Sequence, residues 1–150
     1  MSRQHMRLTV SIVAFVLLAA IFAAPLLAAA SSPVAVAIYA AFSWACHQRP
    51  ERCWHLAGYP LAVCMRCLGI YAGALAGSLL GLRFSRRLLL LSLGLLGTEW
   101  VAEVLGWVSP PAMTRVVFGF LAGCLLVSVL AGEQGGGGFR TLWVREEVKP

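Results

Sequence analysis

The chain has 150 residues, of which 60% are hydrophobic and only 12% are charged. Soluble globular domains are about 45–50% apolar, so this composition is typical of a membrane protein. The net charge of +6 does not indicate a nucleic-acid-binding protein, because the basic residues lie at the ends of apolar runs and form no stripe with interleaved aromatic residues. A disordered chain and a large two-domain enzyme are excluded as well.

Four apolar runs have the length of membrane-spanning helices, which need about 20 residues to cross the hydrocarbon core. These runs are residues 8–30, 61–82, 88–107 and 113–131. A shorter apolar stretch, residues 34–46, is interpreted as a partly embedded helix, and the polar residues, prolines and glycine of 47–60 predict a loop. The expected fold is all-α, a polytopic membrane helical bundle. It forms a single membrane domain over residues 1–132, with a soluble tail over 133–150.

The basic residues predict the orientation, because Lys and Arg near span ends stay in the cytoplasm. With four spans, both termini lie on one side of the membrane. That side would hold Arg3, Arg7, Arg83, Arg86, Arg87, Arg140, Arg145 and Lys149. We therefore expect both termini in the cytoplasm and the loop 47–60 on the exoplasmic face of the inner (plasma) membrane. The first run also fits a secretory signal peptide, and its cleavage would leave the loop on the same side.

Glycine recurs every fourth residue in the second run, at Gly69, Gly73, Gly77 and Gly81. This spacing places small residues on one helix face, which allows close helix packing in lipid. Packing within the chain is the expected use of this face. A homo-oligomer or a larger membrane complex docked through it is the alternative.

The candidate chemistry lies around the start of the second run. Cys64 and Cys67 form a Cys-x-x-Cys pair at a helix amino end, where the partial positive charge favours thiolates. The loop could return Cys46 and His47 to this pair, and zinc prefers four such ligands in a closed tetrahedral site. The expected metal ligands are Cys46, His47, Cys64 and Cys67. Because neighbouring side chains rarely reach one ion, Cys53 or His55 is an alternative to His47.

An exoplasmic location also permits disulfides, for instance Cys64 with Cys67 and Cys46 with Cys53. Small four-helix membrane oxidoreductases that pass electrons from thiols to quinone share this outline. The alternative function is therefore a quinone-linked thiol-disulfide oxidoreductase with Cys64 and Cys67 as the redox pair. Cys124 lies alone in the fourth run and is expected to be a core residue.

The sequence reads Cys-His-Gln-Arg-Pro-Glu-Arg from Cys46 and Pro-Leu-Ala-Val-Cys-Met-Arg-Cys-Leu-Gly-Ile-Tyr from Pro60. These motifs resemble domain-of-unknown-function family 2085, small predicted multi-spanning proteins of bacteria and archaea, and the resemblance covers most of the chain. The matching positions are Cys46, His47, Gln48, Arg52, Cys64, Arg66, Cys67, Gly69 and Tyr71. Cys53 stands where the family usually shows serine. The resemblance therefore implies three motif cysteines, which cannot all pair in one chain but complete a metal shell with His47. It implies no known activity.

Glu99 and Glu103 fall inside the third run, where a charge costs about 2.5–3.5 kcal/mol at the helix centre. They are four residues apart and face one way in the outer half of the span, and Arg66 and Arg115 enter from the same side. We expect these four charges to pair and lock the spans under the site. The alternative is that Glu99 or Glu103 carries a proton, ligates the metal or anchors a ligating imidazole. The resemblance also implies an acidic residue in the third span and an Arg in the fourth.

The sequence thus predicts an integral membrane protein with an external Cys/His site that holds zinc and acts as a metal-stabilised structural or accessory-subunit module. Catalysis is not the expected role, and a transporter is the least favoured function. The expected partner is the lipid bilayer, with no nucleic acid. The residues expected to support the site are Gln48, Arg52, Arg66, Glu99, Glu103 and Arg115.

Overall fold

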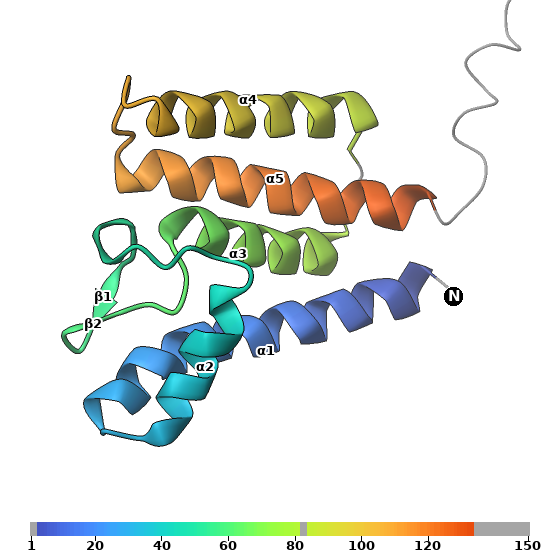
Figure 1. Cartoon of the computed structure of the whole chain (residues 1–150). Helices are drawn as coiled ribbons and strands as arrows, with labels where there is room; N and C mark the ends of the chain where they lie inside the picture. Colours follow the sequence, from blue (N-terminus) through green and yellow to red (C-terminus); the bar gives the residue numbers. More distant parts are fainter. Residues whose placement is uncertain (1–2, 82–83, 134–150) are drawn as a thin grey trace, which may run out of the picture.

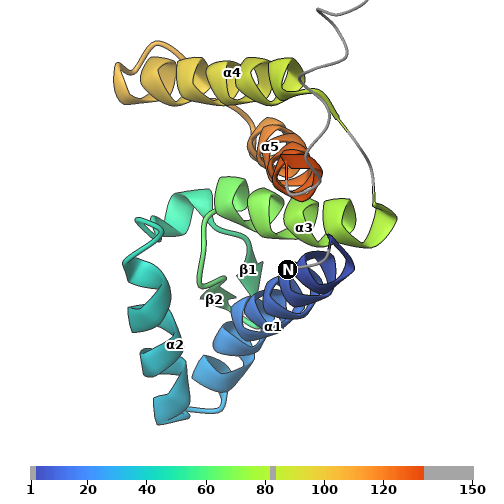
Figure 2. The same cartoon turned by 90° about the vertical axis from the view of Figure 1, so that its right-hand side faces the viewer.

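The computed structural model describes residues 3–81 and 84–133. The expected all-α fold is confirmed: these residues form five helices, one 3-10 turn and one small hairpin (Figure 1). The helices are α1 Arg3–Ala29, α2 Pro33–Ser43, α3 Met65–Leu80, α4 Arg86–Val104 and α5 Ala112–Glu133. Helices α1, α3, α5 and α4 lie alongside one another in that order, and α2 folds back at one end of α1 (Figures 1 and 2). Arg83 and residues 134–150 of the predicted tail lie outside the described residues, and Glu133 is the last residue of α5.

Local sequence signals set the helix ends. The Ser32 hydroxyl accepts the Val34 N–H at the start of α2, and the Ser85 hydroxyl accepts the Leu88 N–H at the start of α4. Such side-chain caps satisfy backbone donors that have no partner within the helix. Gly81 ends α3 in the left-handed conformation, with φ of 64°, which glycine adopts without steric cost.

The loop before α3 is more ordered than expected. It contains the 3-10 turn Pro50–Arg52 and a hairpin of β1, His55–Leu56, and β2, Tyr59–Pro60. Ala57 and Gly58 between the strands both have positive φ, 52° and 84°. Two such residues make the turn whose twist matches antiparallel strands, so the hairpin closes here and returns the chain toward α3.

Residues 61–64 lie outside any helix and the first three of them are buried, so α3 begins four residues later than the predicted span. Leu61 and Val63 are 1% and 0% exposed, and they pack on Ile21 and Ala24 of α1. At the opposite end of the bundle, the Arg7 guanidinium donates to the Gly81 carbonyl at 3.1 Å. Helix α1 therefore contributes to the core and contacts α3 at both ends.

The glycine face of α3 packs against α5. A Cβ added at Gly73 would collide with the backbone carbonyl of Phe120, and one at Gly119 with that of Arg66. At Gly77 the Cβ would lie 2.8 Å from the Cys124 carbonyl oxygen. The expected packing within the chain is present at these positions. Because α5 covers this face, we do not propose it as a docking surface for a partner.

Substituting Gly73 tests this packing. We expect Gly73→Ala to lower the free energy of unfolding by about 1–3 kcal/mol, because the added methyl group overpacks the contact with Phe120. The matched control is Gly94→Ala in α4, where an added Cβ has nothing within 4 Å. Thermal unfolding in detergent measures the stability of both purified variants. Equal stability of Gly73→Ala and Gly94→Ala would contradict the close contact between Gly73 and the Phe120 backbone.

Two helices are long and apolar enough to cross a membrane: Gln4–Ala29, with mean hydropathy 2.7, and Ala112–Leu130, with 2.1. Helix α3 has 16 residues, or about 24 Å at 1.5 Å per residue, which is short of a hydrocarbon core of about 30 Å. Helix α4 carries two arginines and two glutamates. Large apolar side chains nevertheless cover its surface, with Leu90 and Leu91 60% and 64% exposed. Exposed apolar surface of this extent is typical of a membrane contact.

Candidate metal centre

Three cysteine sulfur atoms from two separate segments meet at one end of the bundle. The Sγ atoms of Cys46, Cys64 and Cys67 all lie within 4.8 Å of one another. A tetrahedral zinc ion with Zn–S bonds of about 2.3 Å holds its sulfur ligands about 3.8 Å apart. Small side-chain adjustments would therefore bring all three sulfurs into the first coordination shell of one ion. All five cysteines are free thiols in the structure.

Gln48 positions the Cys46 segment. Its side-chain amide donates to the carbonyl oxygens of Tyr39 and Ala62, both at 2.8 Å. The backbone of Gln48 is left-handed, with φ of 48°, a conformation that is uncommon for a residue with a Cβ. These bonds join the end of α2 to the segment before α3 and thereby hold Cys46 beside the helix start.

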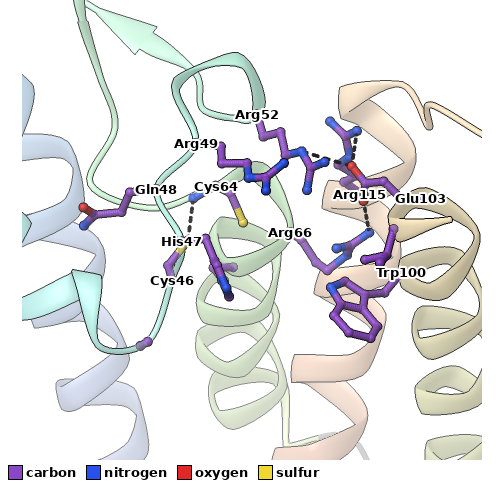
Figure 3. Close-up of a pocket in the computed structure, with 13 residues that line it drawn as sticks. Cys46, His47, Gln48, Arg49, Arg52, Cys64, Arg66, Trp100, Glu103 and Arg115 are labelled. Atoms are coloured by element: carbon purple, nitrogen blue, oxygen red, sulfur yellow. Dashed lines mark hydrogen bonds and ion pairs between the residues drawn. The ribbon is translucent and has the colours of Figure 1, made fainter. Parts of the chain in front are cut away.

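The other two sulfurs lie at the amino end of α3, where Cys64 is the N-cap residue and Cys67 is in the first turn. The Cys64 backbone N–H donates to the Cys46 sulfur at 3.2 Å (Figure 3). Hydrogen bonds from the Cys64 and Cys67 thiols, helped by backbone N–H groups, lower the pKa of Cys46 to about 2 against the opposing effect of burial. The site therefore favours a thiolate, the form of cysteine that binds metal.

His47 lines the same cavity as the sulfurs, but its ring nitrogens are not among the ligand atoms that lie within 4.8 Å of one another. His47 therefore does not join the three sulfurs in this structure. Cys53 and His55, the alternatives to His47, are not in this group either. Cys53 is a buried thiol 3.2 Å from the Arg49 carbonyl oxygen, and burial is the main cause that raises its pKa to about 12.

A cluster of charges lies next to the sulfurs and centres on Glu103, whose side chain is 4% exposed. Its carboxylate contacts Arg52 at 3.2 Å, Arg66 at 3.1 Å and Arg115 at 2.7 Å (Figure 3). Arg66 also reaches Glu99 at 3.2 Å. The four charges expected to pair are thus in contact, and Arg52 joins them from the loop. These ion pairs connect the ends of α3, α4 and α5 with the 3-10 turn.

A cavity of about 360 Å³ separates the sulfurs from the charges. All three clustered cysteines line it, together with His47, Gln48, Arg49, Arg52, Arg66, Glu103, Arg115 and Trp100. The sequence singled out neither Arg49 nor Trp100 as a site residue. The position of Arg49 between the motif residues Gln48 and Arg52 is the sequence feature from which its place in the site could have been predicted.

The family described as "Predicted membrane protein (DUF2085)" matches residues 46–129. The chain belongs to this family. The match starts at Cys46 and contains every residue of the sulfur and charge clusters. The expectation from the cysteine motifs is therefore confirmed.

Two archaeal proteins, both described as uncharacterized, are similar to this chain. A protein of Methanocaldococcus jannaschii is 30% identical over 104 residues, which cover 63% of this chain and 66% of the relative. A protein of Methanothermobacter thermautotrophicus is 48% identical over 33 residues, 22% of this chain and 30% of that protein. The chain thus spans slightly less than two thirds of the first relative and under one third of the second. No solved structure matches the chain.

Proposed function

We propose that the protein is a membrane module stabilised by a zinc ion bound to Cys46, Cys64 and Cys67. The convergence of three sulfurs within 4.8 Å, from segments 18 residues apart, is the observation that carries this proposal. Free thiols packed as apolar filler have no need to converge, whereas a metal requires it. The ion would cross-link the end of the loop to the start of α3.

His47 is the side chain that we propose for the fourth coordination position. It follows Cys46 directly and lines the same cavity, and its exposure leaves its ring able to turn toward the sulfurs when the metal binds. A water molecule is the other ligand that this cavity can supply, because zinc sites with three protein ligands complete their shell in this way.

Metal analysis combined with thiol counting tests the proposal. We expect the protein purified under reducing conditions to hold about one zinc ion per chain. A strong chelator should remove the ion, free three additional thiols and lower the unfolding temperature, because metal binding contributes to folding free energy. The proposal would be contradicted if the purified protein contained no metal and if the chelator changed neither its thiol count nor its unfolding temperature.

Thiol-disulfide exchange is the second candidate function, because the free thiols of Cys64 and Cys67 lie within 4.8 Å of each other. Cys64 and Cys67 would form the redox pair, with quinone as the electron acceptor. The same thiol count distinguishes the two functions. Two thiols lost as a reversible disulfide, with no metal present, would support the oxidoreductase.

We further propose that α3 and α4 cross the membrane beside α1 and α5, giving four spans. Their position between or beside the two apolar helices (Figure 1) and the exposed leucines of α4 support this arrangement. Both termini would then be cytoplasmic and the cysteine loop exoplasmic in the plasma membrane, as the basic residues indicate. Labelling an introduced cysteine at Ala57, which is exposed at the hairpin turn, from outside intact cells tests the orientation. Labelling only after lysis would contradict it.

A further inference from the structure

The cavity beside the sulfurs carries more positive charge than the nearby acidic side chains neutralise. It is lined by four arginines, Arg49, Arg52, Arg66 and Arg115. Among the described residues, the carboxylates paired with these arginines are Glu99 and Glu103. Four guanidinium groups against two carboxylates leave an excess of two positive charges. A zinc ion with three thiolates, or a single thiolate without metal, offsets only one of them.

Several donor groups of these arginines have no partner among the described residues, and one carboxylate oxygen, Glu99 Oε1, is also buried without one. Arg49 takes part in none of the ion pairs found in the described part of the chain. The Nε atoms of Arg66 and Arg115 are buried and have no hydrogen-bond acceptor among the described residues. Buried donors normally have partners, and the planar guanidinium group fits the oxygens of a phosphate or carboxylate with two parallel hydrogen bonds. The cavity therefore suits an oxyanion.

An apolar groove adjoins this cavity. Trp100 lines both the cavity and a second hollow of about 500 Å³ on α4. The lining of this second hollow includes Gly94, Gly97, Val101 and Trp107. A Cβ added at either glycine would meet nothing within 4 Å, so the groove has no neighbouring helix over these positions. A positively charged pocket that adjoins an open apolar groove has the chemistry to recognise an anionic amphiphile.

The position of the cavity agrees with a lipid headgroup. Arg66 lies in the first turn of α3, Arg115 in the first turn of α5 and Glu103 in the last turn of α4. All three helix ends meet at the same end of the bundle (Figure 1), and Arg115 is only about 4.5 Å along α5 from its start at 1.5 Å per residue. In a membrane protein, the ends of the spanning helices lie near the headgroup regions that flank the hydrocarbon core on both sides of the bilayer.

We propose that this cavity binds the phosphate group of an anionic phospholipid, with an acyl chain in the groove along Gly94 and Gly97. Arg49 and Arg52 contact the phosphate from the loop, and Trp100 packs where the headgroup meets the chain. The proposal does not rest on the metal, because the excess of positive charge is present with or without it.

Lipid titration of the full chain tests the proposal. The protein in neutral detergent is titrated with short-chain phosphatidylglycerol and with phosphatidylcholine of the same chain length, and binding is followed by native mass spectrometry. We expect the anionic lipid to bind at least about tenfold more tightly, since its phosphate carries no compensating cation. Arg49→Gln should weaken its binding about tenfold, the value of one hydrogen bond to a charged group. Equal affinity for the two lipids would overturn the proposal.

Two controls separate the lipid from other causes. Arg86→Gln removes an exposed arginine outside the cavity and should leave binding unchanged, so an equal loss in Arg49→Gln and Arg86→Gln would indicate nonspecific charge attraction and overturn the site. Gly97→Leu adds a side chain to the groove lining, at a position where a Cβ meets nothing within 4 Å, and should weaken lipid binding. A separate titration with inorganic phosphate completes the test. Phosphate binding that accompanies unchanged lipid affinity in Gly97→Leu would overturn the lipid assignment in favour of a free anion.

Discussion

Cys64→Ser is expected to abolish zinc binding. Cys64 supplies one of three converging sulfurs and its backbone N–H holds the Cys46 sulfur at 3.2 Å. A serine hydroxyl stays protonated at neutral pH and is a poor zinc ligand. We expect zinc affinity to fall by more than about 100-fold, the upper range for losing only a residue that supports a ligand. Competition with a chromophoric chelator measures this change, and the unfolding temperature should fall with it.

Cys53→Ser is the matched control for this substitution. Cys53 lies in the same loop and is buried, but its sulfur is outside the cluster and contacts the Arg49 carbonyl oxygen. Serine can donate to that carbonyl in the same way. Zinc affinity should therefore be unchanged. Equal losses in the two variants would mean that the substitutions act through the loop fold and not through metal ligation.

Glu103→Gln is expected to cause the largest loss of stability among substitutions outside the cysteines. One carboxylate with a 4% exposed side chain receives three guanidinium groups. Glutamine keeps the volume but removes the charge, which leaves Arg52, Arg66 and Arg115 clustered without their common partner. Removing one member of a buried ion pair costs about 3–5 kcal/mol. Chemical or thermal unfolding in detergent should show a decrease of this size.

Substitutions of two other glutamates serve as comparisons for the stability loss expected in Glu103→Gln. Glu99 accepts one ion pair, so Glu99→Gln should have a smaller effect than Glu103→Gln. Glu51 is exposed, and Glu51→Gln should change the free energy of unfolding by no more than about 0.5 kcal/mol. If Glu103→Gln were as stable as Glu51→Gln, the ion-pair cluster would not hold the helix ends together.

The composition and the hydrophobic runs predicted the helical architecture, because apolar runs of about 20 residues have few alternatives to helix formation. They did not predict where α3 begins. Leu61, Ala62 and Val63 continue the apolar run, but they are not helical and are buried against α1 and α2. Hydropathy cannot distinguish a residue buried in protein from one facing lipid, which is why the predicted second span is longer than the helix.

The candidate site was predictable where spacing along a helix decides proximity. Cys64 and Cys67 are three residues apart, and Glu99 and Glu103 are four apart, so each pair shares a helix face. The position of His47 depended instead on backbone direction at a loop residue, which the sequence pattern does not contain. The contribution of Arg49 depended on the return path of the loop. That path is set by the Gln48 hydrogen bonds to Tyr39 and Ala62.

X-ray absorption at the zinc edge of the purified full chain tests the central claim most directly, because it counts sulfur atoms around the ion. The convergence of Cys46, Cys64 and Cys67 predicts three sulfur neighbours at about 2.3 Å and a fourth, lighter ligand at about 2.0–2.1 Å. Cys64→Ser should reduce or abolish the zinc signal. A zinc shell made only of nitrogen and oxygen, or protein whose sulfurs are bonded to each other at about 2.05 Å, would contradict the account.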